Sequence, residues 1–221
     1  MSYKQDDFES VIAMFQDINS PLNRYASFDY CYKYFQESSK DDLLADIEKS
    51  CLVIGFYLAS WGMLRGSSFL LNKSLKYYEP LVLYIANLDK KIWEIDVDSY
   101  TDENIKIICD IYHDIQILII DDNNAHLTLV TKIMLGVFGF VPAFDRYFTD
   151  AFRAIFKGKS AFRSLNAKSL KCIHEFYIDN KSEIDKTSQN TFVIDFKSGI
   201  TTSINYKKAK IIDMYGVMKG G

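Results

Sequence analysis

The chain has 221 residues, of which 48% are hydrophobic and 25% are charged, a composition that suits one compact domain with a sizeable core. Its most hydrophobic stretches are interrupted by Lys, Arg, Asp or Ser well before the roughly 20 apolar residues that a membrane-spanning helix needs. The sequence therefore indicates a soluble protein with no membrane partner, and its net charge is only -3.

Two core helices are predicted in the first half of the chain, because apolar residues recur there at steps of three and four, which stack side chains on one helix face. The first helix is marked by Leu44, Ile47, Cys51, Ile54, Leu58 and Trp61. The second helix is marked by Ile105, Ile108, Tyr112, Ile115 and Ile119. Thr101, followed by Asp102 and Glu103, suits the start of the second helix through capping and the helix dipole.

Shorter helices complete the pattern along the rest of the chain. They are expected over residues 7–18, 28–35, 80–88, 127–138, 146–156, 166–178 and 205–217. Only TFVIDF, residues 191–196, is typical of a strand, and DNKSEIDKTSQN before it is expected to be a polar surface loop. The sequence therefore predicts a single all-α domain over residues 1–221, with at most a short strand pair near 191–204.

The spacing of cysteine and histidine gives no sign of a metal or cofactor site. The four cysteines are widely spaced, form no C-x-x-C pair and follow no apolar signal segment, which indicates reduced thiols in a cytoplasmic protein. They are Cys31, Cys51, Cys109 and Cys172, and the three histidines are equally scattered. We therefore expect no metal and no cofactor, and metal-dependent hydrolysis ranks below the other functions.

The charge of the chain changes sign at Asp145. Up to and including this residue there are 12 Lys and Arg residues against 22 Asp and Glu residues, and after it there are 14 against 7. Either the acidic part, 1–145, and the basic part, 146–221, attract each other, or the basic part binds a polyanion. Seven cations lie between Arg146 and Lys171, opposed by one acid.

This basic cluster is the candidate DNA surface, because Lys and Arg side chains neutralise backbone phosphates and release counterions. Its candidate DNA-binding residues are Arg146, Arg153, Lys157, Lys159 and Arg163. The loop from Lys157 to Ser160 adds backbone amides that are able to hold phosphate. A further group, Lys207, Lys208 and Lys210, is expected on the outer face of the last helix. The alternative for the basic cluster is a solvated face that balances the acidic half. Surface solubility explains the group on the last helix equally well.

The stretch TLVTKIMLGVFGFVPAFDRYF, residues 128–148, places an apolar helix, a Phe-Gly step and a proline before one acidic residue. The residues that form this pattern are Phe138, Gly139, Pro142 and Asp145. The stretch resembles a segment of the helix-hairpin-helix DNA glycosylase superfamily, in which an Asp opens the helix that follows a Pro-containing turn. The resemblance covers little more than this stretch, and it implies an all-helical fold, DNA as a partner and Asp145 as the catalytic residue.

The chain departs from that superfamily upstream of the stretch. Members usually carry a hairpin of the form L-x-G-x-G, whose backbone amides bind DNA phosphate. The equivalent segment here, DDNNAHLTLVTK, contains no glycine, and Asp121 and Asp122 would repel phosphate. Lyase-active members also place a lysine in the hairpin helix. Lys132 is the nearest candidate, but only 13 residues separate it from Asp145, which is too short, so no nucleophilic lysine is expected.

The sequence leaves two interpretations of Asp145 open. Breaking an N-glycosidic bond develops oxocarbenium character on the sugar, and a fixed carboxylate stabilises that positive charge and orients water. Backbone N–H groups at a helix start would hold such a carboxylate in its ionised form. The alternative uses the same geometry, since Asp is a favoured N-cap residue and Pro142 marks the turn before it.

The stretch FYLASWGMLRGSSFLL, residues 56–71, ends the first core helix with a Trp, an Arg and two glycines. Gly62 and Gly66 are unfavourable inside a helix, so either the helix ends there or the backbone closely approaches another group. If that group is an extruded base, Trp61 supplies a stacking surface and Arg65 a hydrogen bond to the base edge. The alternative is a core Trp beside an Arg that pairs with a carboxylate.

Two hypotheses about function follow. The first is a DNA glycosylase-like hydrolase that excises a modified or damaged base, with Asp145 in the catalytic role and Trp61 and Arg65 near the base. For a compact member without the usual hairpin, the resemblance implies phage defence through attack on modified phage bases. The second is a non-enzymatic helical protein that binds another protein. A cleft with Asp145 at its mouth, facing the basic cluster, would favour the first hypothesis.

Overall fold

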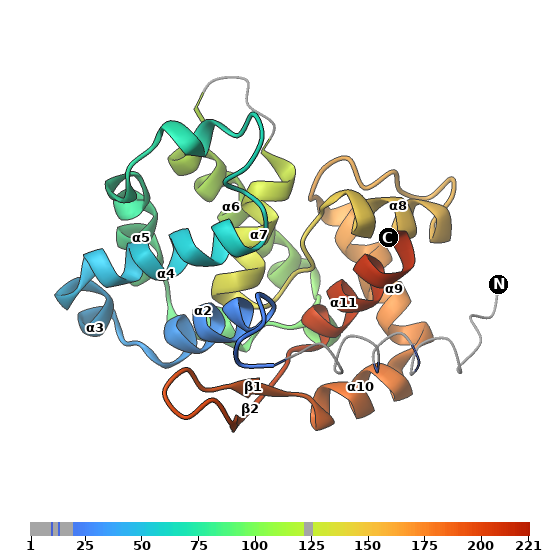
Figure 1. The fold of residues 1–221 in the computed structure, drawn as a ribbon. Helices are drawn as coiled ribbons and strands as arrows, with labels where there is room; N and C mark the ends of the chain where they lie inside the picture. The colour runs from blue at the N-terminus through green and yellow to red at the C-terminus, as the bar shows by residue number, and fades with distance from the viewer. Residues whose placement is uncertain (1–9, 11–12, 14–19, 122–125) are drawn as a thin grey trace.

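The computed structural model describes Ser10, Ala13 and the ranges 20–121 and 126–221, and these residues are mostly helical (Figure 1). The α-helices are α2 (Ala26–Glu37), α3 (Lys40–Ala45), α4 (Ile47–Ser60), α5 (Glu79–Ala86), α6 (Asp102–Ile119), α7 (Leu127–Phe138), α8 (Arg146–Ile155), α9 (Ala167–Asp179), α10 (Lys181–Asn190) and α11 (Lys208–Gly220). Short 3-10 helices and two strands complete the fold: η1 (Phe69–Asn72), η2 (Leu75–Tyr78), η3 (Lys90–Glu94), η4 (Val97–Ser99), β1 (Phe192–Ile194) and β2 (Thr201–Asn205). The predicted all-α fold with a short strand pair is confirmed. Among the described residues, no helix is both long enough and apolar enough to cross a membrane.

The predicted helices from residue 20 onward are present, with bounds that differ by a few residues, whereas the helix predicted over 7–18 falls largely outside the described residues. α6 begins after Thr101, whose side chain accepts a hydrogen bond from the Asn104 amide. The first predicted core helix is divided into α3 and α4. Asp46 lies between the two helices, and its side chain caps α4 by accepting from the Lys49 amide.

The segment predicted as a polar loop, DNKSEIDKTSQN, forms α10 instead. Ile184 and Ser188, four residues apart, are buried on one face of this helix, and the Ser188 hydroxyl donates to the Tyr206 carbonyl over 2.6 Å. Lys181 and Asp185 form an i,i+4 ion pair of 2.8 Å. A narrow buried face and an intrahelical ion pair therefore stabilise a helix whose composition is typical of a loop.

α7 is buried along most of its length, and it contacts α2, α4 and α6 (Figure 1). All of its residues from 129 to 138 are buried. Gly136 leaves room for the Tyr57 ring of α4, because a Cβ at this position would overlap that ring. The Tyr57 hydroxyl donates to the Lys132 carbonyl over 3.0 Å. This packing fixes the end of α4, and hence Trp61, beside the middle of α7.

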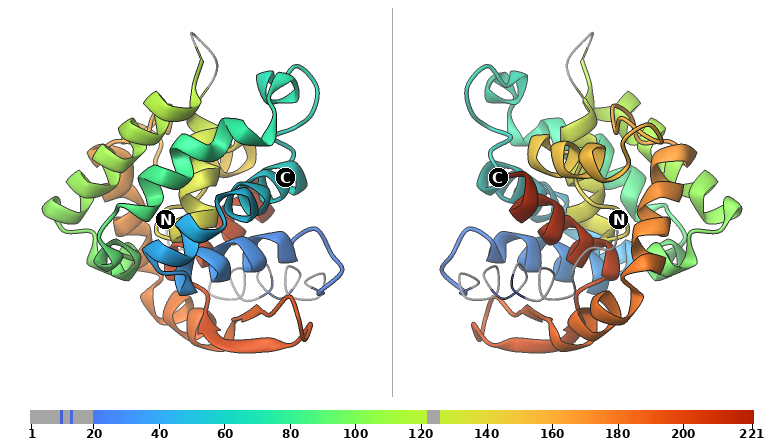
Figure 2. Two further views of the ribbon diagram at one scale, coloured as in Figure 1. Left: turned by 90° about the vertical axis from the view of Figure 1, so that its left-hand side faces the viewer. Right: turned by 90° about the vertical axis from the view of Figure 1, so that its right-hand side faces the viewer.

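α8 and α11 pack closely against each other, as the right-hand view of Figure 2 shows. Gly216 lies against the Phe148 ring and Gly220 lies against the Tyr147 backbone, with no room for a Cβ at either position. The Phe148 ring also stacks on that of Phe152, with centroids 4.2 Å apart. This close crossing brings α11 next to the segment that enters α8.

β1 and β2 form an antiparallel hairpin that lies below α2 in Figure 1. Ile194 of β1 is opposite Thr201 of β2. Asp29 of α2 joins the hairpin to the core, since its buried carboxylate accepts from the Ile194 amide over 3.1 Å and from the Tyr206 hydroxyl. The hairpin therefore covers the side of the fold on which α2 lies.

Candidate functional site

The turn that enters α8 is held at successive residues by side chains of other elements. The Ala143 amide donates to Oδ1 of Asp213 on α11 over 2.9 Å. The Phe144 amide donates to the Thr131 hydroxyl over 2.8 Å, and the Phe144 carbonyl accepts from the Thr128 hydroxyl over 2.9 Å. The backbone ahead of α8 is therefore fixed relative to both α7 and α11.

Asp145 is the N-cap of α8. Its Oδ1 accepts from the Phe148 amide over 3.0 Å, and its Oδ2 lies 3.2 Å from Nζ of Lys132. The Asp145 side chain is 16% exposed and that of Lys132 is 6% exposed, so the carboxylate reaches solvent while the ammonium group is nearly enclosed. The capping role is confirmed, and the ion pair is an addition that capping does not require.

Lys132 reaches Asp145 although the sequence interpretation predicts that 13 residues are too few. α7 ends at Phe138, where Gly139 takes a left-handed conformation with a φ of 71°, and the chain then runs back along the same helix. The hydrogen bonds between Phe144 and α7 hold the returning segment in place. The contact exists because this tight reversal puts the residue after the turn beside the middle of α7.

Trp61 lies next to this ion pair, immediately after the end of α4. Nζ of Lys132 is 5.2 Å from the centroid of the Trp61 ring, and Nζ of Lys210 is 4.9 Å from it. The ring also packs edge-on against that of Tyr25, at 5.4 Å. Its Nε1 is buried without a hydrogen-bond partner among the described residues. The side chain packs against the core but stays partly exposed, so Trp61 contributes to the core, and its role in stacking a base stays a prediction.

A second lysine and aspartate pair is buried beside the Trp61 ring. Lys210 and Asp213 are 1% and 3% exposed, and Nζ of Lys210 lies 2.8 Å from Oδ2 of Asp213. This corrects the prediction that Lys207, Lys208 and Lys210 lie on the outer face of the last helix. The middle of α11 is enclosed by other elements, so its polar side chains are buried along with its apolar ones. An i,i+3 Lys and Asp spacing among apolar residues is the sequence signal for such a pair.

Arg65 is exposed and lies across the turn that follows α4. α4 ends at Ser60, before both glycines, as one of the two interpretations predicts. Gly62 and Gly66 adopt left-handed φ values of 76° and 60° in the turn that follows. A Cβ on Gly62 would be 3.0 Å from Nε of Arg65, which shows that the Arg65 side chain folds over this glycine. No carboxylate of the described part of the chain forms an ion pair with Arg65, and the residue is exposed.

Some cations of the basic cluster are neutralised within their own half of the chain. The guanidinium groups of Arg146 and Arg153 lie 3.7 and 3.1 Å from the Asp150 carboxylate. Lys159 forms an ion pair with Glu175. These three predicted DNA-binding residues are exposed, but each one shares its charge with an acid.

Other ion pairs join the basic half to the acidic half. Lys171 lies 2.8 Å from Asp102, and Lys208 lies 2.6 Å from Asp98. The two halves of the chain therefore attract each other, which is one of the two interpretations of the charge asymmetry. Fewer cations are therefore available to bind a polyanion than the count of Lys and Arg residues in the sequence indicates.

Several cations of the cluster are accessible to a polyanion. Those that are exposed and form no ion pair with a described residue are Lys157, Arg163 and Lys168. The amides of Lys159 and Ser160, which the sequence assigns to phosphate binding, donate instead to the Phe156 carbonyl over 2.8 and 3.1 Å. Side chains, not these two amides, are therefore the groups that would hold phosphate here.

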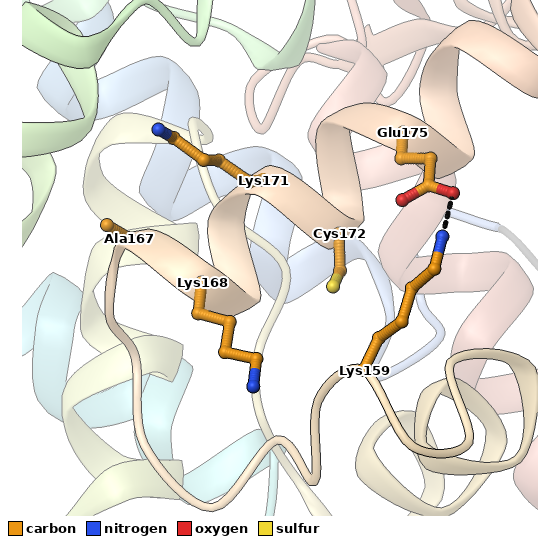
Figure 3. A pocket seen from close by; sticks show the side chains of 6 residues that line it. All are labelled: Lys159, Ala167, Lys168, Lys171, Cys172 and Glu175. Carbon is orange, nitrogen blue, oxygen red and sulfur yellow. Dashed lines mark hydrogen bonds and ion pairs between the residues drawn. The ribbon is translucent and has the colours of Figure 1, made fainter.

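A shallow hollow of about 510 Å³ lies beside the basic cluster (Figure 3). Its lining residues are Lys159, Ala167, Lys168, Lys171, Cys172 and Glu175. Burial raises the pKa of the Cys172 thiol, so this cysteine is a poor nucleophile at neutral pH. A second hollow of about 400 Å³ is lined by residues of α4, η2 and α5. Asp145 lines neither hollow, so neither one is the cleft that catalysis by this residue would need.

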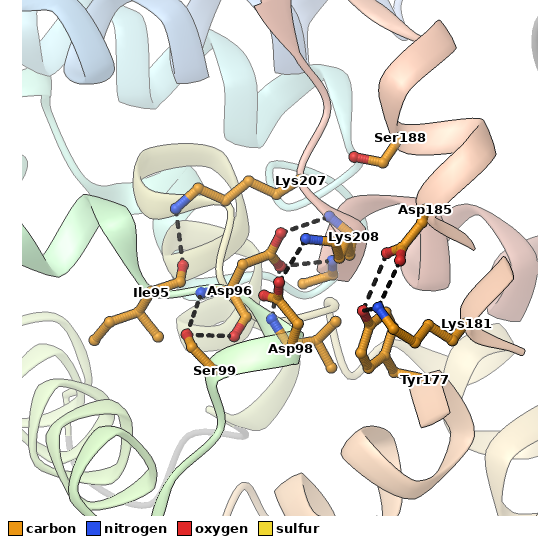
Figure 4. A network of polar contacts seen from close by, with 12 residues as sticks. Ile95, Asp96, Asp98, Ser99, Tyr177, Lys181, Asp185, Ser188, Lys207 and Lys208 are labelled. Atoms are coloured by element: carbon orange, nitrogen blue, oxygen red, sulfur yellow. Dashed lines mark hydrogen bonds and ion pairs between the residues drawn. The ribbon is translucent and has the colours of Figure 1, made fainter. Parts of the chain in front are cut away.

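A separate polar network joins the start of α11 to η3 and η4 (Figure 4). Asp96 accepts from three backbone amides at 2.7 to 3.0 Å, two of them at the start of α11. Lys207, which directly precedes α11, donates to two backbone carbonyls of the segment around η3, whereas Asp96 accepts from the start of α11. Burial lowers the pKa of Lys207 to about 8 and raises that of Asp96. Because its partners are backbone groups, this network clamps segments together.

The segment equivalent to the glycosylase hairpin is only partly described, since residues 122–125, and with them Asp122, lie outside the described ranges. Asp121 accepts from the Tyr77 hydroxyl over 2.9 Å and forms an ion pair with Lys73. The charge of Asp121 is therefore partly neutralised, and its repulsion of phosphate is weaker than the sequence implies.

Comparison of the chain with protein-family models, curated proteins and solved structures found no match in any of the three. Within the described residues, no three His, Cys, Asp or Glu side chains are grouped so that they could hold a metal ion. The candidate site is therefore defined by geometry. It consists of Trp61, Lys132, Asp145, Lys210 and Asp213, which together are called the Trp61 cluster.

Proposed function

We propose that the chain is a DNA glycosylase-like hydrolase that excises a modified or damaged base, with Asp145 as its catalytic carboxylate. The observation that supports this most is the contact of Lys132 with both Asp145 and the Trp61 ring. It places a fixed, partly exposed carboxylate close to a partly exposed indole. Cleavage of an N-glycosidic bond requires an anion near the sugar and a flat surface for the extruded base.

In the proposed reaction, the bond between C1′ of the deoxyribose and the base nitrogen breaks, and both electrons leave with the base. The Asp145 carboxylate stabilises the positive charge that develops on the sugar. Water adds to C1′, its proton passes to Asp145 and then to solvent, and the base takes up a proton from solvent. Because hydrogen bonds hold the turn ahead of α8, the carboxylate needs no reorganisation as the charge develops.

The proposed DNA surface begins with Arg146 at the start of α8 and continues to Lys157 just beyond its end. α8 has 10 residues, so these positions are roughly 15 Å apart at 1.5 Å per residue. This span matches several phosphates of one strand. All four cysteines are free, which suits a reducing cytoplasm. Bases modified by phages are the candidate substrates that the glycosylase resemblance implies, and phage defence is the corresponding role.

Incubation with a panel of DNAs tests the proposal. Duplex and single-stranded oligonucleotides with natural, damaged or phage-type modified bases are mixed with the full chain, and abasic sites are detected by alkaline strand cleavage. We expect abasic sites in at least one modified DNA, and none with Asp145→Asn. If every DNA in the panel stays intact, the proposed activity is wrong.

The alternative is a non-enzymatic helical protein that binds another protein. One observation favours it: Leu52 and Phe56, one turn apart on α4, are 52% and 69% exposed. A protein-binding module would leave every DNA of the panel intact, and Asp145→Asn would change only its stability. The same panel therefore separates the two functions.

A further inference from the structure

Lys210 and Asp213 form a second charged pair in the Trp61 cluster, and it is more deeply buried than the pair of Lys132 and Asp145. A buried ion pair is a weak source of stability, because desolvation of the two charges offsets most of their attraction. Apolar residues of similar volume would serve stability at least as well. The role of this pair therefore lies in the groups that it holds in position, and not in its contribution to stability.

Asp213 connects α11 to the turn that carries Asp145. Its Oδ2 takes part in the ion pair with Lys210, and its Oδ1 accepts from the Ala143 amide over 2.9 Å. The Ala143 carbonyl in turn accepts from the Asp145 amide over 2.8 Å. Two hydrogen bonds thus link the Asp213 carboxylate to the backbone of the proposed catalytic residue.

Lys210 acts on the other component of the cluster, the Trp61 ring. Its Nζ lies 4.9 Å from the centroid of that ring and 4.6 Å from the centroid of the Phe28 ring. An ammonium group over an aromatic face is attracted by the ring quadrupole, most strongly by that of Trp. Since Nζ of Lys132 is 5.2 Å from the same indole, two cations hold the Trp61 ring.

We infer that Lys210 and Asp213 are positioning residues: Asp213 fixes the turn that presents Asp145, and Lys210 fixes the indole of Trp61. Neither is a catalytic residue, because neither is exposed enough to touch a substrate. The inference rests on the proposed function for its effect on catalysis. Its effect on the turn and on the indole is independent of any activity.

Two double variants separate positioning from charge burial. Lys210→Met with Asp213→Asn removes both charges but keeps an oxygen that accepts from Ala143. Lys210→Met with Asp213→Leu removes the acceptor as well, and Asp213→Ala replaces the leucine if that side chain does not fit. Asp29→Asn is the matched control, because Asp29 is also buried and accepts from a backbone amide, that of Ile194, in the hairpin contact.

Hydrogen exchange of the Ala143 amide reports on the turn, and 19F NMR of protein labelled with 5-fluorotryptophan reports on the indole. The leucine double variant should exchange the Ala143 amide proton at least about tenfold faster than wild type, whereas the asparagine double variant and the control should match wild type.

The chain has two tryptophans, so two fluorine signals are expected. Lys210→Met should move the Trp61 signal but not that of Trp93, whose ring lies 4.5 Å from Nζ of Lys90. Lys210→Arg should restore the Trp61 signal toward wild type.

On a DNA that wild type cleaves, the kcat of the leucine double variant should fall about 100-fold, while its KM should change less than about threefold. Misplacement of a reacting group acts mainly on the chemical step, which kcat reports. The asparagine double variant should lose less kcat than the leucine double variant, because it keeps the acceptor for the Ala143 amide and lacks only the cation over the Trp61 ring. Equal Ala143 exchange in the two double variants, an unmoved Trp61 signal, or equal kcat values would overturn the inference. If wild type cleaves no DNA, the proposed function fails, and the exchange and fluorine measurements decide the positioning roles alone.

Discussion

Two groups of lysines and aspartates meet at α11, and they have different partners. At the start of the helix, Asp96 and Lys207 bind backbone amides and carbonyls of neighbouring segments. One turn further on, Lys210 and Asp213 contact side chains as well, including the Trp61 ring. The first group joins segments of the chain, and the second surrounds a partly exposed indole.

The difference between the two groups shows how a buried charge is to be interpreted. The pKa of Lys207 is lowered to about 8 by burial, yet its hydrogen bonds run to backbone carbonyls. Shifted pKa values often mark functional sites, but here the shift belongs to a structural joint. In the Trp61 cluster, by contrast, the Asp145 side chain is 16% exposed and Nε1 of Trp61 has no partner among the described residues. Accessibility and an unsatisfied polar atom, and not a shifted pKa, are therefore the features that support the proposed site.

The largest effect on stability is expected from Asp96→Ala. Three backbone amides lose their acceptor, and each buried unsatisfied donor costs about 1 to 3 kcal/mol, so the free energy of unfolding should fall by about 4 kcal/mol. Asp98→Ala, which removes the half-exposed partner of Lys208, should cost less than about 1 kcal/mol. Chemical denaturation measures both variants. Equal losses would contradict the structural role of Asp96.

A comparison of the two tryptophans sharpens the distinction between core and site. Trp93 is 4% exposed and its Nε1 donates to the Val137 carbonyl, so Trp93→Ala should lower the free energy of unfolding by about 4 kcal/mol. Trp61 is partly exposed, so Trp61→Ala should lower it by only about 2.5 kcal/mol. Base excision per folded molecule should fall roughly 10- to 100-fold for Trp61→Ala alone, since a stacking contact contributes about 1 to 3 kcal/mol. Thermal melting and a cleavage assay measure the two quantities. A greater stability loss for Trp61→Ala than for Trp93→Ala would assign Trp61 to the core.

The structural joint should also have its own pH dependence. Burial lowers the pKa of Lys207 from 10.5 to about 8, against the attraction of Asp96, Asp98 and Glu94. Between pH 8 and 9 the unfolded chain keeps the Lys207 proton that the folded chain releases, so unfolding takes up a proton and the free energy of unfolding rises with pH. The rise is at most about 1.4 kcal/mol per pH unit.

Lys207→Met should remove this rise, and denaturant midpoints at pH 8 and 9 would show the difference from wild type. Lys208→Met is the control, because the pKa of Lys208 is raised and its titration lies above this window. Titration of the buried cysteines is common to all three proteins and cancels in the comparison. Parallel stability curves for wild type and Lys207→Met would rule out a shifted pKa at this lysine.

The smallest effects are expected on the proposed DNA surface. Lys157→Gln removes an exposed cation that has no ion pair with a described residue, so the slope of log K against log salt should decrease in magnitude by about 0.9, the value of one phosphate contact. Lys159→Gln should change the slope less, because Lys159 is paired with Glu175. Binding at several salt concentrations gives both slopes. An unchanged slope for Lys157→Gln would show that this lysine does not belong to the proposed DNA surface.

The helical core can be predicted from the sequence because its apolar periodicity is strong. α6 and α7 begin and end close to the residues that the pattern indicates. α10 cannot be predicted in this way, since Ile184 and Ser188 give it only a narrow buried face within a polar segment. The division of the first core helix at Asp46 is also missed, because a capping residue inside an apolar pattern does not interrupt the periodicity.

The candidate site can be predicted only in part. Asp145 and Trp61 stand out because a proline turn and glycines surround them in the sequence. Lys132 and Asp213 do not, because their roles depend on the chain reversal after Phe138 and on the crossing of α8 with α11. Local patterns identify residues at turns and helix ends, whereas partners from distant segments emerge only from tertiary packing.

The central claim is that Asp145 carries out chemistry in addition to capping α8. Its most direct test is the single-turnover rate of base excision by Asp145→Asn, on a DNA that wild type attacks, measured together with DNA binding and thermal melting. The asparagine oxygen still accepts from the Phe148 amide, so we expect a folded protein that binds DNA and has lost about 2 kcal/mol of stability, because Lys132 loses its charged partner. Excision should slow roughly 1000-fold or more, since several kcal/mol of charge stabilisation are removed and each 1.36 kcal/mol is tenfold in rate. A rate close to that of wild type would contradict the claim and leave Asp145 as a helix cap alone.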